Sequence, residues 1–148
     1  MQTEKIDLSE ALPLIKSVLA TGGVFRLYPH GVSMLPTIRE GRDTVSLSSP
    51  EGIKRGDIVL YTRQADGAPI LHRVVRATEN GFDIRGDNQI MPEKDVRSQN
   101  VIAVVSEYTN GKRTVKRGSF TFGIQNIAAD IERPFKRLYR HFFGFSKK

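Results

Sequence analysis

The segment from Ile58 to Val75, IVLYTRQADGAPILHRVV, decides the fold, because it contains two strand-like runs joined by a tight turn. Residues 57–63 and 70–77 are rich in β-branched and other apolar side chains, a composition that predicts strands. Between them lies Asp66-Gly67, a dipeptide typical of hairpin turns. The sequence therefore predicts an antiparallel hairpin near the centre of the chain.

The same alternation of short strands and turns extends from about residue 24 to residue 115. Turn dipeptides recur at Asn80-Gly81 and Asn110-Gly111. Several short strands joined by tight turns predict a mainly β fold of coiled antiparallel sheets. The further strands are expected at residues 24–28, 43–48, 82–86 and 101–108.

Helical patterns flank this β-body on both sides. In residues 8–21, apolar side chains recur every three or four positions, Asp7 or Ser9 can cap the start, and Gly22-Gly23 ends the pattern. A second pattern begins near Phe120, with basic residues between the apolar ones. We therefore expect a β-rich domain with an N-terminal helix over residues 1–118 and a basic amphipathic helical tail over residues 119–148.

Composition limits the classes of protein to consider. A chain of 148 residues forms one domain, and the absence of cysteine excludes a disulfide framework and a thiolate metal site. No pattern indicates a metal or a cofactor, and we expect none. The net charge is +7, and from residue 116 onward eight basic side chains stand against two acidic ones, so the basic character belongs to the tail.

The sequence also bears on location and partners. No run approaches the roughly 18 apolar residues of a membrane span, and the N-terminus lacks the basic start of a signal peptide, so we expect a cytoplasmic protein. The tail has two open interpretations: it packs on the β-body, or it makes peripheral contact with an anionic membrane. Nucleic-acid binding is disfavoured, because a lone N-terminal helix leaves no helix-turn-helix and the body is nearly neutral.

The loop GVSMLPT, Gly31 to Thr37, contains a serine that is either an ordinary turn hydroxyl or a nucleophile. A nucleophilic serine needs a base, and His72 in the central hairpin is a candidate, although a lone histidine in a strand is more often a packed or solvated residue. Asp87 follows a strand and a glycine, where it can orient a histidine or form an Asx-turn. Asp95 is a second acidic candidate that by itself is typical of a solvated loop.

Five motifs in order, GVSMLPTIREGRDTVSL, IKRGDIVLYTR, ILHRVV, IRGDNQ and NVIAVVSEY, resemble the catalytic domain of type I signal peptidases over residues 24–108. These enzymes belong to a clan that includes the self-cleaving SOS and phage repressors. In the common bacterial branch and the repressors the base is lysine, whereas in the endoplasmic-reticulum and archaeal branch it is histidine followed by Arg-Val. This chain has His72-Arg73-Val74 and no lysine in that strand, so it resembles the serine–histidine branch.

The resemblance implies a serine endopeptidase that cuts an extended leader or precursor peptide. Ser33 carries over as nucleophile, His72 as general base and Asp87 as orienting acid, with Asp95 as an alternative second acid. The alternative function is a non-catalytic peptide-binding module on the same scaffold. The family's membrane anchor has no counterpart in this sequence, which leaves the substrate open.

The substrate would bind along the sheet edge as an extended strand. We expect Gly31 to allow close approach of its backbone, Met34 and Leu35 to line an apolar groove, and Pro36 to fix the exit of the loop. His30 carries no functional expectation. The Gly-Asp turns ending at Asp43 and Asp57 are interpreted as structural.

Overall fold

The structure is a computed structural model, and it describes residues 7–123. Within that range the chain forms an α-helix, eight strands and a short 3₁₀ turn, and a further helical turn covers residues 120–123. In order these are α1 (Leu8–Ala20), β1 (Phe25–Leu27), β2 (Val45–Ser48), β3 (Ile58–Thr62), β4 (Pro69–Thr78), β5 (Gly81–Arg85), β6 (Glu93–Val96), η1 (Ser98–Asn100), β7 (Val101–Asn110) and β8 (Arg113–Lys116).

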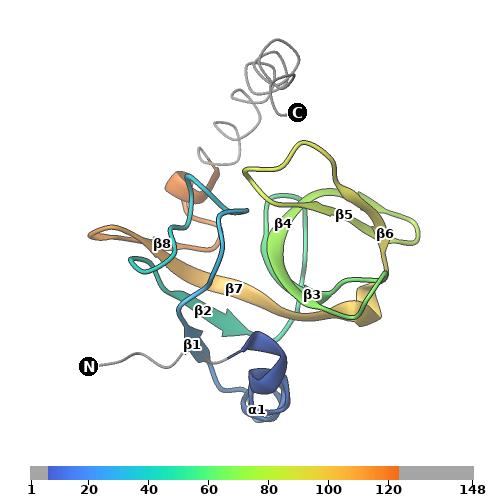
Figure 1. Cartoon of the computed structure of the whole chain (residues 1–148), viewed down its shortest axis with the longest axis horizontal. Coiled ribbons are helices and arrows are strands. Elements are labelled where there is room, and N and C mark those ends of the chain that lie inside the picture. The colour runs from blue at the N-terminus through green and yellow to red at the C-terminus, as the bar shows by residue number, and fades with distance from the viewer. Residues whose placement is uncertain (1–6, 124–148) are drawn as a thin grey trace, which may run out of the picture.

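All strand pairings are antiparallel, in the order β1-β2-β7-β3-β4-β5-β6, with β8 also paired to β7. Register shifts interrupt four of the pairings, and such bulges bend a sheet. Figure 1 shows the result: β3 to β6 curl into a rounded body, β1, β2 and β8 lie on the other side, and β7 runs through both. The predicted mainly β, antiparallel fold is confirmed.

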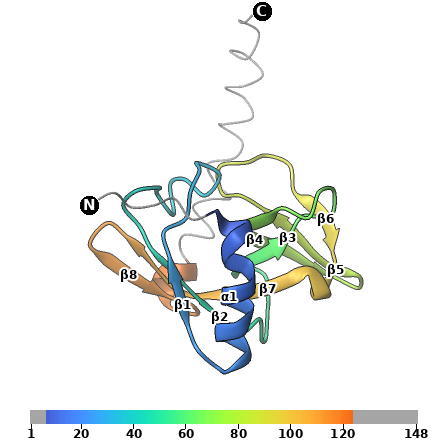
Figure 2. The ribbon, with the colours of Figure 1, turned by 60° about the horizontal axis from the view of Figure 1, so that its bottom comes forward.

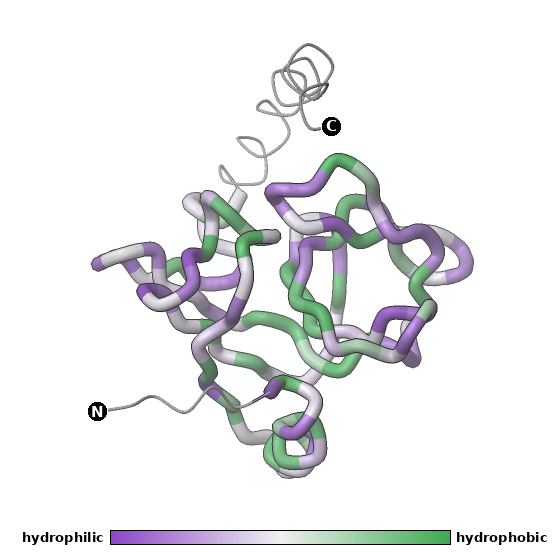
Figure 3. Tube along the Cα trace, viewed as in Figure 1, coloured by the Kyte–Doolittle hydropathy of each residue, from purple (hydrophilic) through white to green (hydrophobic). Residues whose placement is uncertain are grey.

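Two hydrophobic clusters stabilise the two halves. The first joins α1 to β2, β7 and β8 through side chains such as Ile15, Leu47 and Val105. Figure 2 shows α1 lying against this part of the sheet. The second cluster fills the rounded body and includes Val59, Val74 and Ile84. Figure 3 shows hydrophobic stretches along the strands and hydrophilic ones at several of the outer turns.

Strand β3 separates the clusters, because alternate side chains point to opposite faces of a strand. Ile58 and Leu60 belong to the first cluster and Val59 to the second, and all three are fully buried. A strand buried on both faces needs an unbroken apolar run, which is what the central hairpin supplies.

The local predictions hold to within a few residues. The helix begins after Asp7, whose carboxylate accepts a hydrogen bond of 2.9 Å from the Ser9 amide. Gly67 adopts a positive φ of 70° in the hairpin turn, as the Asp-Gly signal requires. Two strands, β6 and β8, were not among those predicted. Both are four residues long with mostly polar sequences, EKDV and RTVK, and within the described residues each pairs with one other strand.

Beyond β8 the described chain is short. Ser119 begins a helical turn that covers residues 120–123. The predicted tail helix spans residues 119–148. Most of it, residues 124–148, lies outside the described residues. Within residues 7–123, no helix has the length and apolar character required to cross a membrane.

Candidate active site

Ser33 and His72 meet, although 39 positions separate them. Ser33 lies on the turn-rich loop between β1 and β2, and His72 lies near the middle of β4. The Ser33 Oγ is 3.0 Å from the His72 Nε2. This distance allows a proton to pass directly from the hydroxyl to the imidazole.

The β3–β4 pairing determines where the imidazole points. His72 is directly opposite Val59 in the register, so its side chain shares a sheet face with the second hydrophobic cluster. The Tyr61 ring lies beside it, with ring centroids 6.3 Å apart and tilted by 53°. His72 is only 8% exposed, and Ser33 is its one side-chain hydrogen-bond partner among residues 7–123. Packing therefore holds the ring with its Nε2 toward the serine.

Burial sets the protonation state of His72. It is the largest effect and lowers the pKa from 6.5 to about 4, against the opposing negative charges of Asp87 and Glu93. At neutral pH the imidazole is therefore uncharged. Only this form accepts a proton from a serine hydroxyl.

The loop of residues 86–89 clamps the serine in place. The backbone N–H of Asn88 donates to the Ser33 carbonyl at 2.8 Å, and the Asn88 side-chain amide donates to the Val32 carbonyl at 3.1 Å. At Gly86, an added Cβ would lie 2.6 Å from the Ser33 carbonyl oxygen and 3.0 Å from the His72 Nε2. The close approach of this loop to the Ser33 backbone and to the His72 ring therefore requires glycine.

Asp87 follows Gly86 in this loop, and its carboxylate bonds Arg73 and Thr37 rather than His72. It receives hydrogen bonds of 2.8 Å from the Nε and the Nη2 of Arg73, and one of 2.5 Å from the Thr37 hydroxyl. Arg73 and Asp87 are almost fully buried. The predicted orienting acid thus supports the loops on both sides of the pair, and it acts on His72 through its charge rather than through a hydrogen bond to the ring.

The other predicted acid, Asp95, is not brought to the pair. It lies on β6 with its side chain exposed, its carboxylate accepts from the Thr78 hydroxyl at 3.2 Å, and its amide donates to Asp83. Asp95 has a positive φ of 52°. Its contacts are those of a bent edge strand.

The predicted substrate-binding residues separate into two groups. Gly31 adopts a φ of 94° and is exposed, Leu35 is half-buried, and Pro36 is exposed and follows a cis peptide bond. Met34 is only 5% exposed and belongs to the first hydrophobic cluster. The expectation that Met34 lines an apolar groove for the substrate is therefore corrected, because its side chain packs in the first hydrophobic cluster.

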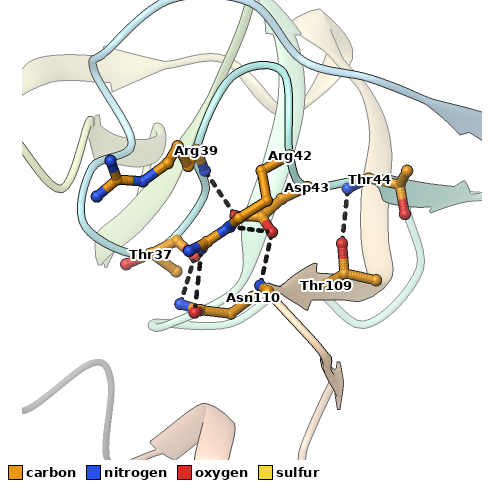
Figure 4. A network of polar contacts seen from close by, with 8 residues as sticks. Thr37, Arg39, Arg42, Asp43, Thr44, Thr109 and Asn110 are labelled. Carbon is orange, nitrogen blue, oxygen red and sulfur yellow. Dashed lines mark hydrogen bonds and ion pairs between the residues drawn. The ribbon is translucent and has the colours of Figure 1, made fainter.

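Asp43 anchors the far end of the serine loop (Figure 4). Its buried carboxylate accepts hydrogen bonds from the Arg39 and Gly111 amides and from the Arg42 guanidinium. Burial alone would raise the pKa of Asp43, but these hydrogen bonds hold it below its ordinary value. Asn110 completes the anchor by donating to the Thr37 carbonyl at 3.0 Å.

The hydrogen bonds of Asp57 and of His30 go to residues other than Ser33 and His72. Asp57 is buried and accepts hydrogen bonds from the Lys54 amide and the Arg117 guanidinium. His30 is exposed and bonds Glu40 at 3.0 Å. In residues 7–123, no group of three or more histidine, cysteine, aspartate or glutamate side chains is arranged to hold a metal ion.

Sequence reasoning missed three residues around the pair. The sequence shows Arg73 as part of a motif and Thr37 at the end of a loop, and its motifs indicate no role for these two residues or for Glu93. Glu93 accepts a hydrogen bond of 2.8 Å from the Tyr61 hydroxyl, and so fixes the ring beside His72. The signal for Arg73 was present, since an arginine in an apolar strand needs a buried anion.

Comparison with known proteins identifies the family of the chain. The Peptidase S24-like family matches residues 1–117, which include Ser33, His72 and Asp87. The chain belongs to the Peptidase S24-like family. No curated protein sequence matches the chain. The scaffold of this S24-like protein is therefore of the peptidase type.

Proposed function

We propose that this S24-like protein is a serine endopeptidase in which Ser33 is the nucleophile and His72 the general base. The observation that supports the proposal most directly is the 3.0 Å distance from Ser33 Oγ to His72 Nε2. The matched family includes peptidases by its description, and both residues lie inside the matched segment. Strand β4 contains no lysine, so His72 takes the place of a lysine base.

In this proposal the reaction proceeds in two stages. Neutral His72 takes the hydroxyl proton as the Ser33 Oγ attacks the scissile carbonyl carbon, and a tetrahedral oxyanion forms. The imidazolium then gives its proton to the leaving amine, and an acyl-serine remains. Water, deprotonated by the same imidazole, attacks the acyl carbon and releases the second product and the free serine hydroxyl.

The oxyanion needs hydrogen-bond donors, and the Ser33 backbone is one candidate. Within residues 7–123 no hydrogen bond uses the Ser33 N–H, while the Ser33 carbonyl is held by Asn88. A backbone N–H whose position is fixed and which has no other acceptor can stabilise developing negative charge without reorganising. We assign the Ser33 N–H to this role.

The substrate in this proposal is an extended peptide, such as a leader or precursor. Strand β1 is the terminal strand of the sheet, and within the described residues its outer edge has no strand partner. Tyr28 and Val32, between β1 and the nucleophile, are 57% and 61% exposed. An open strand edge offers backbone hydrogen bonds, and the apolar side chains beside it offer contacts to a peptide.

The test is cleavage of a peptide library by purified wild-type protein and by Ser33→Ala, read by mass spectrometry. Defined cuts that are absent with Ser33→Ala support the proposal. Tight peptide binding without cleavage, unaffected by Ser33→Ala, would favour the peptide-binding module instead.

A further inference from the structure

Phe122, just beyond β8, is buried beside Arg73, the residue that holds the Asp87 carboxylate. The preceding Ser119 hydroxyl accepts a hydrogen bond of 3.3 Å from the Phe122 amide, and its carbonyl accepts one of 3.1 Å from Gly123. This single turn directs two phenylalanines differently. Phe122 is 4% exposed, whereas Phe120 is 84% exposed.

The buried Phe122 ring lies against Arg73 and Tyr108. The Arg73 guanidinium carbon lies 5.6 Å from the centroid of the Phe122 ring, a cation–π arrangement, and the Tyr108 ring lies at 6.1 Å with a tilt of 54°. Arg73 has a side-chain exposure of 3%. In such surroundings a cation–π contact is stronger than at a surface, because water does not compete for the cation.

Arg73 connects this contact to the loops around the serine. It follows His72 on β4 and holds both carboxylate oxygens of Asp87. Asp87 in turn accepts from Thr37, on the serine loop, and precedes Asn88, whose amide holds the Ser33 carbonyl. A continuous set of contacts thus runs from Phe122 to the backbone of the nucleophile.

We propose that Phe122 is a positioning residue, and that docking of the segment after β8 onto Arg73 holds the Asp87–Asn88 loop against Ser33. The catalytic consequence rests on the function proposed above, whereas the mechanical consequence does not. The chain beyond β8 would then do more than cover the core: release of Phe122 would loosen the clamp on the nucleophile.

The test compares Phe122→Leu with Phe120→Leu in the full-length protein. Leucine keeps an apolar side chain at residue 122 but removes the aromatic face from Arg73, and Phe120→Leu makes the same chemical change at an exposed site. Hydrogen exchange of the Asn88 and Gln89 amides reads the clamp without any need for activity. The Arg63 amide, which donates to the Ala68 carbonyl in the β3–β4 turn, serves as a distant reference.

We expect Phe122→Leu to accelerate exchange of the Asn88 amide by about tenfold relative to the Arg63 reference, and Phe120→Leu to leave it unchanged. With a cleaved peptide, Phe122→Leu should lower kcat with little change in KM, because Phe122 does not contact the strand edge proposed for the substrate. Equal exchange at Asn88 in wild type and Phe122→Leu would overturn the inference. Accelerated exchange in a protein that shows no peptidase activity would retain the inference and overturn only the proposed function.

Discussion

The Oγ of Ser33 and the Nε2 of His72 lie 3.0 Å apart, although one belongs to a loop and the other to strand β4. Each side chain is placed by a different part of the fold. His72 is packed on the apolar face of the rounded β-body, and Ser33 is held by Asn88. The Ser33–His72 pair can therefore be tested by changing either side chain or the residues that hold it in place.

Replacing the proposed base should abolish turnover. We expect His72→Gln to lower kcat/KM by at least about a thousandfold, because His72 is the hydrogen-bond partner of the Ser33 hydroxyl among residues 7–123. His30→Gln is the matched control, since His30 is exposed and bonds Glu40. Steady-state kinetics on one cleaved peptide measure both variants. Equal losses in the two variants, or none in His72→Gln, would contradict the assignment.

Activity should persist to unusually low pH. Because the pKa of His72 is lowered to about 4, the neutral base predominates down to that pH, and kcat/KM should fall only as pH drops through about 4. A pH profile of kcat/KM, with folding checked at each pH, measures the acid limb. An acid limb near 6.5, the ordinary value for histidine, would show that burial does not control this group.

The same shift predicts a loss of stability in acid. Between pH 6.5 and about 4 the unfolded chain binds a proton at His72 that the folded chain does not, so the free energy of unfolding falls as pH decreases. The full effect is roughly 3 kcal/mol for this one group. Urea denaturation at several pH values should show a steeper decline for wild type than for His72→Gln, which cannot titrate there. Parallel curves would count against the prediction.

Breaking the buried ion pair should destabilise the protein strongly. Asp87→Asn removes the charge that compensates Arg73 in the interior, and loss of one partner of a buried pair costs roughly 3–5 kcal/mol. Asp66→Asn removes one partner of the exposed Arg63–Asp66 pair and should leave the urea midpoint nearly unchanged. Similar midpoints for the two variants would mean that the Arg73–Asp87 pair does not support the fold.

The close packing of Gly86 can be tested with one methyl group. Gly86→Ala would place a Cβ 2.6 Å from the Ser33 carbonyl oxygen, so the two loops must move apart and the pair must lose alignment. A shift of about 1 Å between the Ser33 hydroxyl and the His72 ring should lower kcat by about a hundredfold. Gly123→Ala is the control, because within residues 7–123 a Cβ there meets no atom within 4 Å beyond its chain neighbours and its own helical turn. Full activity in Gly86→Ala would show that the loop spacing is not critical.

Much of the fold follows from local sequence signals. The apolar runs of β3 and β4 and the Asp66-Gly67 turn predict the central hairpin, since an antiparallel sheet buried on both faces needs these residues. Strand β6 was not predicted, because its EKDV sequence has no strand signal. Its extended conformation depends instead on pairing with β5.

The site was predictable in its two principal residues but not in its supports. Ser33 and His72 were identified through motifs in a fixed order, and the structure brings them into contact. Asp87 was predicted to orient the histidine, yet its hydrogen bonds go to Arg73 and Thr37. Which partner a buried carboxylate takes depends on how two loops and strand β4 converge, and sequence spacing does not contain that information. The burial of Met34 was missed for the same reason.

The central claim is that His72 activates Ser33 as a nucleophile, and covalent labelling tests it most directly. Wild type, Ser33→Ala and His72→Gln are incubated with a fluorophosphonate at pH 7, and intact mass and peptide mapping locate the adduct. We predict one adduct on Ser33 in wild type, none in Ser33→Ala, and a labelling rate in His72→Gln lower by at least about a thousandfold. An unlabelled wild type, or labelling of Ser33 at the same rate in His72→Gln, would contradict the claim.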